Sequence, residues 1–143
     1  TRRVAGMTFE TAVAVRYGDI DSYGHVNNAT YGTYLEEARI DYLTEVIDAE
    51  TDVLAAEGAG TGIVIASLEI EFERPLRDVR TVDIELSIQR LGTTSFPVEY
   101  AIRDGGDTVA TAETTVVTYD REAGEPCPIP EDWREAIREF EGI

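Results

Sequence analysis

Hydrophobic and polar residues follow two different spacings along this chain. A short β-branched stretch, Thr11 to Tyr17, predicts a first strand with Val13 and Tyr17 on one face. From Asn28 onward, apolar side chains recur at helical spacing and polar ones lie mostly on the other side. The pattern predicts one helix of roughly 20 residues, capped by Asn27 or Asn28.

A second spacing begins after the glycine-rich stretch EGAGTG, residues 57–62, which ends the helical region. Apolar residues then alternate with polar ones, which predicts four strands with one buried and one wet face. The buried faces are Leu68, Ile70 and Phe72; Val82, Ile84, Leu86 and Ile88; Phe96, Val98, Tyr100 and Ile102; and the apolar positions of Thr108 to Tyr119. Pro97 falls on the wet face of the third of these strands and indicates an edge or a bulge. The segment Pro130 to Phe140 has the spacing of a short amphipathic helix.

These elements predict an α+β fold in which an antiparallel sheet of about five strands covers one long helix. A single helix cannot cover five strands alone. The 143 residues contain no linker and no repeat, so residues 1–143 are expected to form one domain.

Charge is the strongest compositional signal. There are 29 acidic and 12 basic residues, a formal net charge of -17, and every basic residue is arginine. This balance argues against nucleic-acid binding. A dense acidic surface without lysine is expected of a protein kept soluble in concentrated salt, so we expect a halophilic cytoplasm; an ordinary acidic protein is the alternative.

Other functions are disfavoured by what the composition lacks. One histidine and one cysteine, Cys127, cannot supply a zinc site, so neither a metal nor a cofactor is expected. The first ten residues lack the apolar run of a signal peptide, and no stretch approaches the length of a membrane span. We therefore expect a cytoplasmic protein without a membrane partner.

The most polar stretch lies directly before the predicted helix. Residues 17–39 read YGDIDSYGHVNNATYGTYLEEAR. The first turn of a helix presents free N–H groups and a positive dipole end, which stabilise an oxyanion. A carboxylate placed just before such a terminus can act as nucleophile or base, the minimum that acyl transfer requires. The alternative is that Asp19, Asp21 and Ser22 only shape the turn.

The order of residues in DIDSYGHVNNATYGTYLEEAR, residues 19–39, resembles the signature of the hotdog-fold acyl-CoA thioesterases related to 4-hydroxybenzoyl-CoA thioesterase. Plant acyl-ACP thioesterases share its His-Val-Asn-Asn part. The order of strand, long helix and antiparallel strands is also similar, and FERPLRDVR, residues 72–80, falls where the family often has an Arg-Pro turn. The resemblance implies hydrolysis of an acyl-CoA, or acyl carrier protein, thioester to free acid and thiol.

The resemblance also assigns catalytic roles. Asp21 matches the family's catalytic carboxylate, which either attacks the carbonyl carbon or deprotonates a water, and the backbone N–H of Asn28 would polarise the thioester carbonyl. His25, together with Asn27, is expected to order the water or help the sulfur leave. A thiol is a good leaving group, so one carboxylate could suffice.

Substrate contacts are expected from two further sets of residues. Arg74, Arg77 and Arg80 fall in one turn and could bind the phosphates of coenzyme A, or could merely balance surface glutamates. Tyr31 is a candidate wall of an acyl tunnel, although a tyrosine stripe at helical spacing is more often core. The resemblance further implies a homodimer or homotetramer with sites at the interface.

Two functions from other classes remain open at this stage. Hotdog folds also include acyl-CoA hydratases and dehydratases, but the histidine and aspartate here are arranged differently from their motif. The chain could also be a non-catalytic acyl-CoA-binding module.

Overall fold

The computed structural model describes residues 9–47, 60–77 and 80–143. Its strands are β1 (Phe9–Ala14), β2 (Thr61–Phe72), β3 (Thr81–Ser87), β4 (Ser95–Asp104), β5 (Asp107–Asp120) and β6 (Glu125–Pro126). Its α-helices are α1 (Tyr31–Tyr42) and α3 (Glu131–Glu141). No helix within these ranges is both long and apolar enough to span a bilayer.

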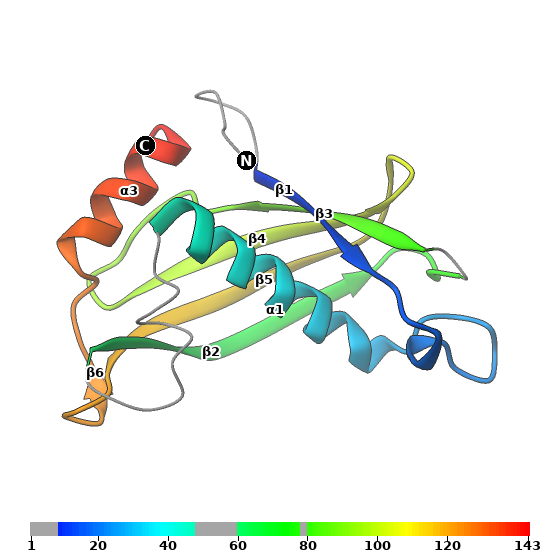
Figure 1. The fold of residues 1–143 in the computed structure, drawn as a ribbon, viewed down its shortest axis with the longest axis horizontal. Coiled ribbons are helices and arrows are strands. Elements are labelled where there is room, and N and C mark those ends of the chain that lie inside the picture. The colour runs from blue at the N-terminus through cyan, green and yellow to red at the C-terminus, as the bar shows by residue number, and fades with distance from the viewer. Residues whose placement is uncertain (1–8, 48–59, 78–79) are drawn as a thin grey trace.

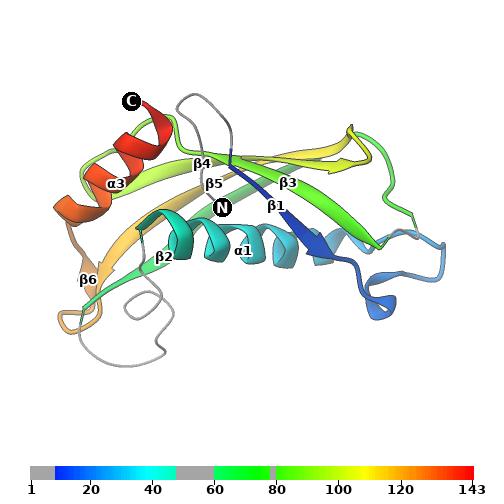
Figure 2. The same cartoon turned by 45° about the horizontal axis from the view of Figure 1, so that its top comes forward.

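The strands form one antiparallel sheet in the order β1-β3-β4-β5-β2, and the two residues of β6 pair with β5. Figure 1 shows α1 lying across this sheet, and Figure 2 shows the sheet curving over the helix. The predicted α+β fold, with five main strands wrapped around one long helix, is therefore confirmed. Only the short β6 was not expected.

The long helical region begins where the sequence predicts. A 3-10 turn at Asn28–Thr30 leads into α1, which continues as a π-helical segment at Leu43–Ile47. The Asn27 side chain accepts a hydrogen bond of 2.9 Å from the N–H of Ala29, so Asn27 is the cap. The side of α1 that faces the sheet carries the buried residues Tyr31, Tyr34, Leu35, Ala38, Arg39 and Tyr42. Residues 57–59 of the glycine-rich stretch lie outside the described residues.

A buried polar contact helps to fix α1 on the sheet. Arg39 is only 8% exposed, and its Nη1 donates a 3.0 Å hydrogen bond to the hydroxyl of Tyr100 on β4. That hydroxyl lies 2.8 Å from the Thr114 hydroxyl on β5. A buried polar group is stable only when it is hydrogen-bonded. These three side chains satisfy one another and so connect the helix to two strands.

The first strand ends earlier than the sequence predicts. Tyr17 is 89% exposed and does not share the buried face of Val13. The backbone N–H of Arg16 donates a 2.8 Å hydrogen bond to the Asp19 carboxylate, which turns the chain into a 3-10 helix at Tyr17–Asp19. The side-chain acceptor competes with the strand ladder and ends it.

Pro97 was expected to mark an edge or a bulge, and it lies where β4 has one neighbouring strand among the described residues. Its strand, β4, lies between β3 and β5. The last β4 residue paired with β3 on that side is Glu99, so Pro97 lies beyond the end of the β3 ladder. A missing N–H costs nothing at a position where no neighbouring carbonyl is present to accept it.

The edge strand β2 leaves apolar surface open. Leu68 and Phe72 were expected to be buried, but they are 48% and 45% exposed. They face α1, because Leu68 pairs with the buried Thr114 and the Phe72 ring packs on the Tyr31 ring. They stay half-exposed because, among the described residues, β2 has a neighbouring strand on one side only.

The opposite face of the sheet is strongly acidic. Glu69, Glu113 and Glu99 lie directly opposite one another on β2, β5 and β4. All three are exposed, and among the described residues no basic side chain pairs with them. Like charges directly opposite on neighbouring strands destabilise a sheet.

The C-terminal helix closes the far end of the core. Trp133 and Ile137 of α3 are buried, which confirms the predicted amphipathic helix. Gly142 ends it at φ 77°, a left-handed conformation that favours glycine. Figure 1 places α3 at one end of the molecule and the polar loop at the other.

Candidate active site

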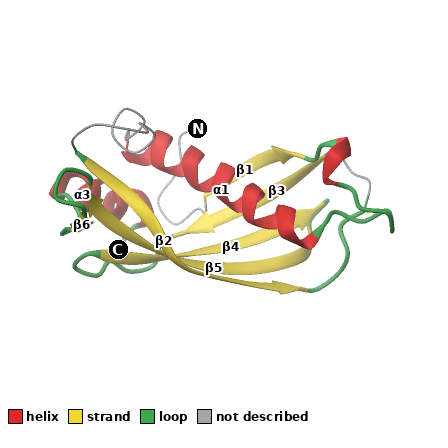
Figure 3. Ribbon diagram, turned by 90° about the horizontal axis from the view of Figure 1, so that it is seen from below, coloured by secondary structure: helices red, strands yellow, loops and turns green. Residues whose placement is uncertain are grey.

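The polar loop between β1 and α1 is held in place by backbone hydrogen bonds. Ile20 and Val26 form an isolated antiparallel bridge within it. The N–H of Val26 donates to the carbonyl of Leu76 at 2.7 Å, and the N–H of Asn27 donates to the carbonyl of Asp19 at 2.9 Å. Figure 3 shows that the loop continues directly into the N-terminus of the helix. The loop is thereby tied both to itself and to the segment after β2.

Asp21 organises the tip of this loop. One carboxylate oxygen, Oδ1, accepts hydrogen bonds from the N–H groups of Tyr23 at 2.9 Å and His25 at 3.2 Å. Gly24 lies at φ 81° and its N–H donates to the Asp21 carbonyl at 3.1 Å, which closes a turn that requires glycine. The other oxygen, Oδ2, accepts no hydrogen bond from the described residues. Asp21 therefore shapes the turn and still has one oxygen available.

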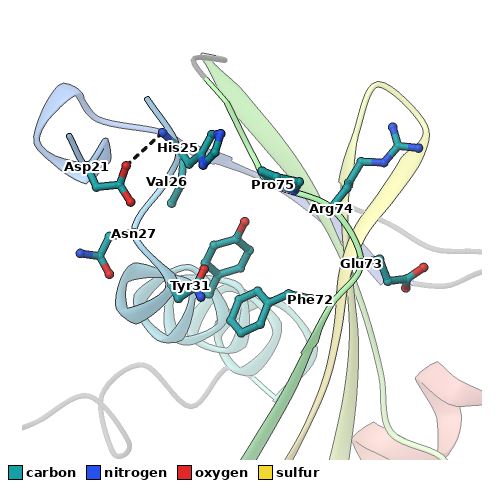
Figure 4. A pocket seen from close by; sticks show the side chains of 10 residues that line it. Asp21, His25, Val26, Asn27, Tyr31, Phe72, Glu73, Arg74 and Pro75 are labelled. Atoms are coloured by element: carbon teal, nitrogen blue, oxygen red, sulfur yellow. Dashed lines mark hydrogen bonds between the residues drawn. The ribbon is translucent and has the colours of Figure 1, made fainter. Parts of the chain in front are cut away.

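His25 meets Asp21 through its backbone rather than its ring. Figure 4 shows the imidazole directed toward Pro75, while the dashed contact joins the Asp21 carboxylate to the His25 N–H. Among the described residues, none forms a hydrogen bond with the ring. The two side chains do not form an Asp-His couple in this structure.

The first turn of the helical region presents a free donor beside Asp21. The N–H of Ala29 is bound by the Asn27 side chain, and the N–H of Thr30 donates to the Asn27 carbonyl at 2.9 Å. In the described part of the chain, nothing accepts a hydrogen bond from the N–H of Asn28. This N–H is oriented by the helix start and is free to bind an incoming oxygen.

These groups line one cavity of about 490 Å³. Its walls are Asp21, His25, Val26, Asn27, Asn28 and Tyr31 from the loop and helix, and Phe72, Glu73, Arg74 and Pro75 from the end of β2. The predicted residues Asp21, His25, Asn27, Asn28, Tyr31 and Arg74 are thus brought together (Figure 4).

The cavity has an aromatic wall. The rings of Tyr31 and Phe72 meet edge to face at 4.9 Å. Burial raises the pKa of the Tyr31 phenol, and a hydrogen bond with the backbone of Leu76 partly opposes this shift. The phenol is therefore neutral near pH 7 and is both a core residue and a wall of the cavity. The sequence pattern indicated Phe72 only as a strand residue, since nothing local shows that β2 ends beside the loop.

The three predicted arginines do not line one cavity. Arg74 lies in the wall of the cavity and its Nη1 is 3.4 Å from the Asp107 carboxylate. Arg80 lines a different cavity, and Arg77 is exposed and lines neither of these two cavities. Leu76, which lies between Arg74 and Arg77, is buried in the core, whereas both of these arginines are exposed.

Asp19 ties the loop to the helix. Its Oδ2 accepts a 2.7 Å hydrogen bond from the Tyr34 hydroxyl as well as the one from the Arg16 N–H. Desolvation acts to raise the pKa of the Asp19 carboxyl, but these hydrogen bonds and the nearby Arg16 charge outweigh it and lower that pKa. Burial and the Asp19 charge raise the pKa of Tyr34. Asp19 thus holds the loop in position for Asp21.

Tyr34→Phe should lower the free energy of unfolding by about 1.5 to 3 kcal/mol, because it removes a hydrogen bond to a charged carboxylate. Since the folded pKa of Asp19 is lowered, its contribution is present above the unfolded value of 3.8 and is lost as the pH falls through the folded pKa. Urea unfolding at pH 7 and at pH 3 measures both effects. A loss of equal size at both pH values would contradict this role of Asp19. Tyr119→Phe, which removes an exposed hydrogen bond to the Gly124 carbonyl, is the control.

A curved antiparallel sheet around one long helix is the hotdog fold, and the relatives named below, which are thioesterases, place this chain among the hotdog-fold thioester hydrolases. The model of the thioesterase-like superfamily matches residues 15–137, and the chain belongs to this family. The family and the class of enzyme predicted from the sequence are confirmed.

Individual relatives agree with this assignment. The long-chain acyl-CoA thioesterase FadM of Escherichia coli (strain K12) is 32% identical over 135 residues, which cover 92% of this chain and 98% of FadM. The 1,4-dihydroxy-2-naphthoyl-CoA hydrolase of Synechococcus elongatus is 27% identical over 122 residues, 83% of this chain and 89% of that protein. A thioesterase from Thermus thermophilus, solved in complex with coenzyme A and Zn, is 32% identical with a TM-score of 0.77 and covers 94% of this chain and 95% of its own. By their names, the first two act on different acyl groups.

Proposed function

We propose that this protein is an acyl-CoA thioesterase in which Asp21 drives hydrolysis beside an oxyanion site formed by the N–H of Asn28. The observation that carries the proposal is the shared cavity: a carboxylate with a free oxygen and an unbound helix N-terminal donor line the same 490 Å³ space. A carboxylate and an oriented N–H at the reacting carbonyl are the groups that acyl transfer needs. The relatives named as acyl-CoA thioesterase and acyl-CoA hydrolase support the same activity.

The chemistry has two possible first steps. In one, Asp21 Oδ2 attacks the carbonyl carbon, the C–S bond breaks, the thiolate leaves, and water then hydrolyses the mixed anhydride. In the other, Asp21 takes a proton from a water that attacks directly, and the same C–S bond breaks. The Asn28 N–H would bind the carbonyl oxygen as negative charge develops on it. Single-turnover hydrolysis in ¹⁸O water tests for the anhydride, since ¹⁸O enters the Asp21 side chain only when water attacks the Asp21 carbonyl carbon of that intermediate.

The aromatic wall indicates where the acyl group would lie. From Tyr31 and Phe72, the face of β2 that is directed toward α1 continues through the partly exposed Ile70 and Leu68. An acyl chain that extends from the carbonyl carbon along this face would cover apolar side chains. Its burial would contribute about 25 cal/mol of binding free energy per Å² of apolar surface.

We also propose that two copies associate along β2, as the resemblance implies. The strand has twelve residues, one edge that no other described strand pairs with, and half-exposed Leu68 and Phe72 on the face toward α1. An exposed edge with an apolar face is a template for pairing with another chain. Sedimentation should give twice the chain mass for the wild type. A monomer that hydrolyses thioesters at full rate would contradict a role of the pair in the site.

The proposed activity is tested by release of free thiol from acyl-CoA thioesters of short, medium, long and aromatic acyl groups, measured in molar KCl. The wild type should release thiol from at least one of them, and the preferred acyl group gives the substrate class. If none releases thiol while the protein remains folded, the thioesterase proposal fails. Hydration of a crotonyl thioester, assayed on the same preparation, would instead indicate a hydratase.

A further inference from the structure

A second cavity lies on the other side of Asp21. It has a volume of about 450 Å³, and Asp21 is the one residue that it shares with the first cavity. Val15 and Ile20 give it an apolar floor, and Arg16, Tyr17 and Arg80 stand around it. A thioester positioned at Asp21 would therefore have one cavity on each side.

Charge distinguishes the two cavities. In the first, Arg74 is paired with Asp107, and a second carboxylate, Glu73, lies in the wall. Apart from Asp21, which lines both cavities, phosphates placed there would meet two carboxylates, Glu73 and Asp107, and one arginine.

The second cavity has the opposite balance. It carries two arginines, of which Arg16 lies 3.5 Å from Glu37, whereas Arg80 pairs with no carboxylate of the described residues. Arg80 is exposed at the cavity mouth, so its guanidinium is free to bind phosphate oxygens through two N–H groups at once. Apart from the shared Asp21, two arginines and one carboxylate, Glu37, therefore lie at this cavity, an excess of cations on a chain with a net charge of -17.

An exposed aromatic ring stands beside these cations. Tyr17 has little contact with the rest of the protein, although it lies in the wall of the cavity. An exposed ring next to arginines offers a stacking surface for a planar base. The apolar floor suits an aliphatic arm, the arginines suit phosphates, and the exposed ring suits a planar base. A ligand that has all three parts would therefore fit this cavity.

We infer that the coenzyme A part of the substrate occupies this second cavity, with its phosphates bound by Arg80 and Arg16, while the acyl group occupies the first. The inference rests on the proposed thioesterase function and adds the orientation of the substrate. The thioester group lies at Asp21, the pantetheine arm lies over Val15 and Ile20, and the nucleotide lies beside Tyr17. Arg80 is then a binding residue for the carrier, whereas Arg74 belongs to the acyl side.

The test compares one acyl group on two carriers, coenzyme A and N-acetylcysteamine, which has no phosphates and no nucleotide. Arg80→Ala should raise the KM for the coenzyme A thioester about 10-fold, as loss of one charge-assisted hydrogen-bonded contact would, and leave kcat unchanged. The KM for the N-acetylcysteamine thioester should not change. The matched control is Arg138→Ala on α3, which removes an exposed arginine remote from both cavities.

Three outcomes would overturn the inference. They are an unchanged KM for the coenzyme A thioester, an equal rise for both carriers, and a 10-fold rise caused by Arg74→Ala instead of Arg80→Ala. If Arg80→Ala does not fold, Arg80→Gln, which keeps most of the side-chain stem, is measured in its place. Calorimetric titration with free coenzyme A keeps the test independent of catalysis. A wild type that binds it and an Arg80 variant that binds about 10-fold more weakly would support the location even if no thioester were hydrolysed.

Discussion

Asp21→Asn should reduce thiol release by roughly 10³-fold while the protein keeps its fold, a loss within the range for removal of an acid-base group. The amide oxygen can still accept the hydrogen bonds from the N–H groups of Tyr23 and His25, so the turn is retained. An amide, however, neither attacks a thioester nor takes a proton from water. Thiol release and thermal unfolding by circular dichroism measure the two properties on the same sample.

Two further variants separate the roles of Asp21. Asp21→Ala removes both turn hydrogen bonds and should also cost about 1 to 2 kcal/mol of stability. His25→Ala leaves the Asp21 carboxylate and the backbone N–H in place, and should slow turnover less than Asp21→Asn does. If Asp21→Asn retained most of the activity, Asp21 would only shape the loop.

Thermal stability should rise steeply with salt, by roughly 10 °C or more in Tm between 0.1 and 2 M KCl, which corresponds to a few kcal/mol. The reason is the net charge of -17 together with the opposed Glu69, Glu113 and Glu99 on the outer face. The Debye length falls from about 10 Å at 0.1 M to about 3 Å at 1 M, so repulsion between neighbouring carboxylates is largely screened. Scanning calorimetry over a KCl series measures the effect.

A single substitution shows whether the outer face is responsible. Glu113→Gln removes the central charge of the row and should raise Tm at low salt and flatten its dependence on KCl. Glu139→Gln removes one exposed charge from α3 and is the control for net charge alone. A Tm independent of KCl in the wild type would show that the acidic composition does not make the fold salt-dependent.

Spacing alone was enough to predict the helix and the main strands, because helical and alternating patterns differ clearly in this chain. The loop side of the site could also be predicted, since Asp21, His25 and Asn28 are close in sequence and precede a helix. The place of Phe72 in the wall of the cavity could not be predicted, because it depends on β2 pairing with β5 rather than with β3. The separation of Arg74 from Arg80 could not be predicted either, since it depends on which cavity each side chain lines in the folded chain.

The length of the β2 edge limits how copies can assemble. This edge runs over twelve residues. If two copies pair β2 with β2 about a two-fold axis, each copy uses this edge, and the surface that could recruit a third chain there is consumed. An edge that stayed open could instead recruit further chains, one after another. Pairing along β2 would therefore end, at this edge, with a closed pair.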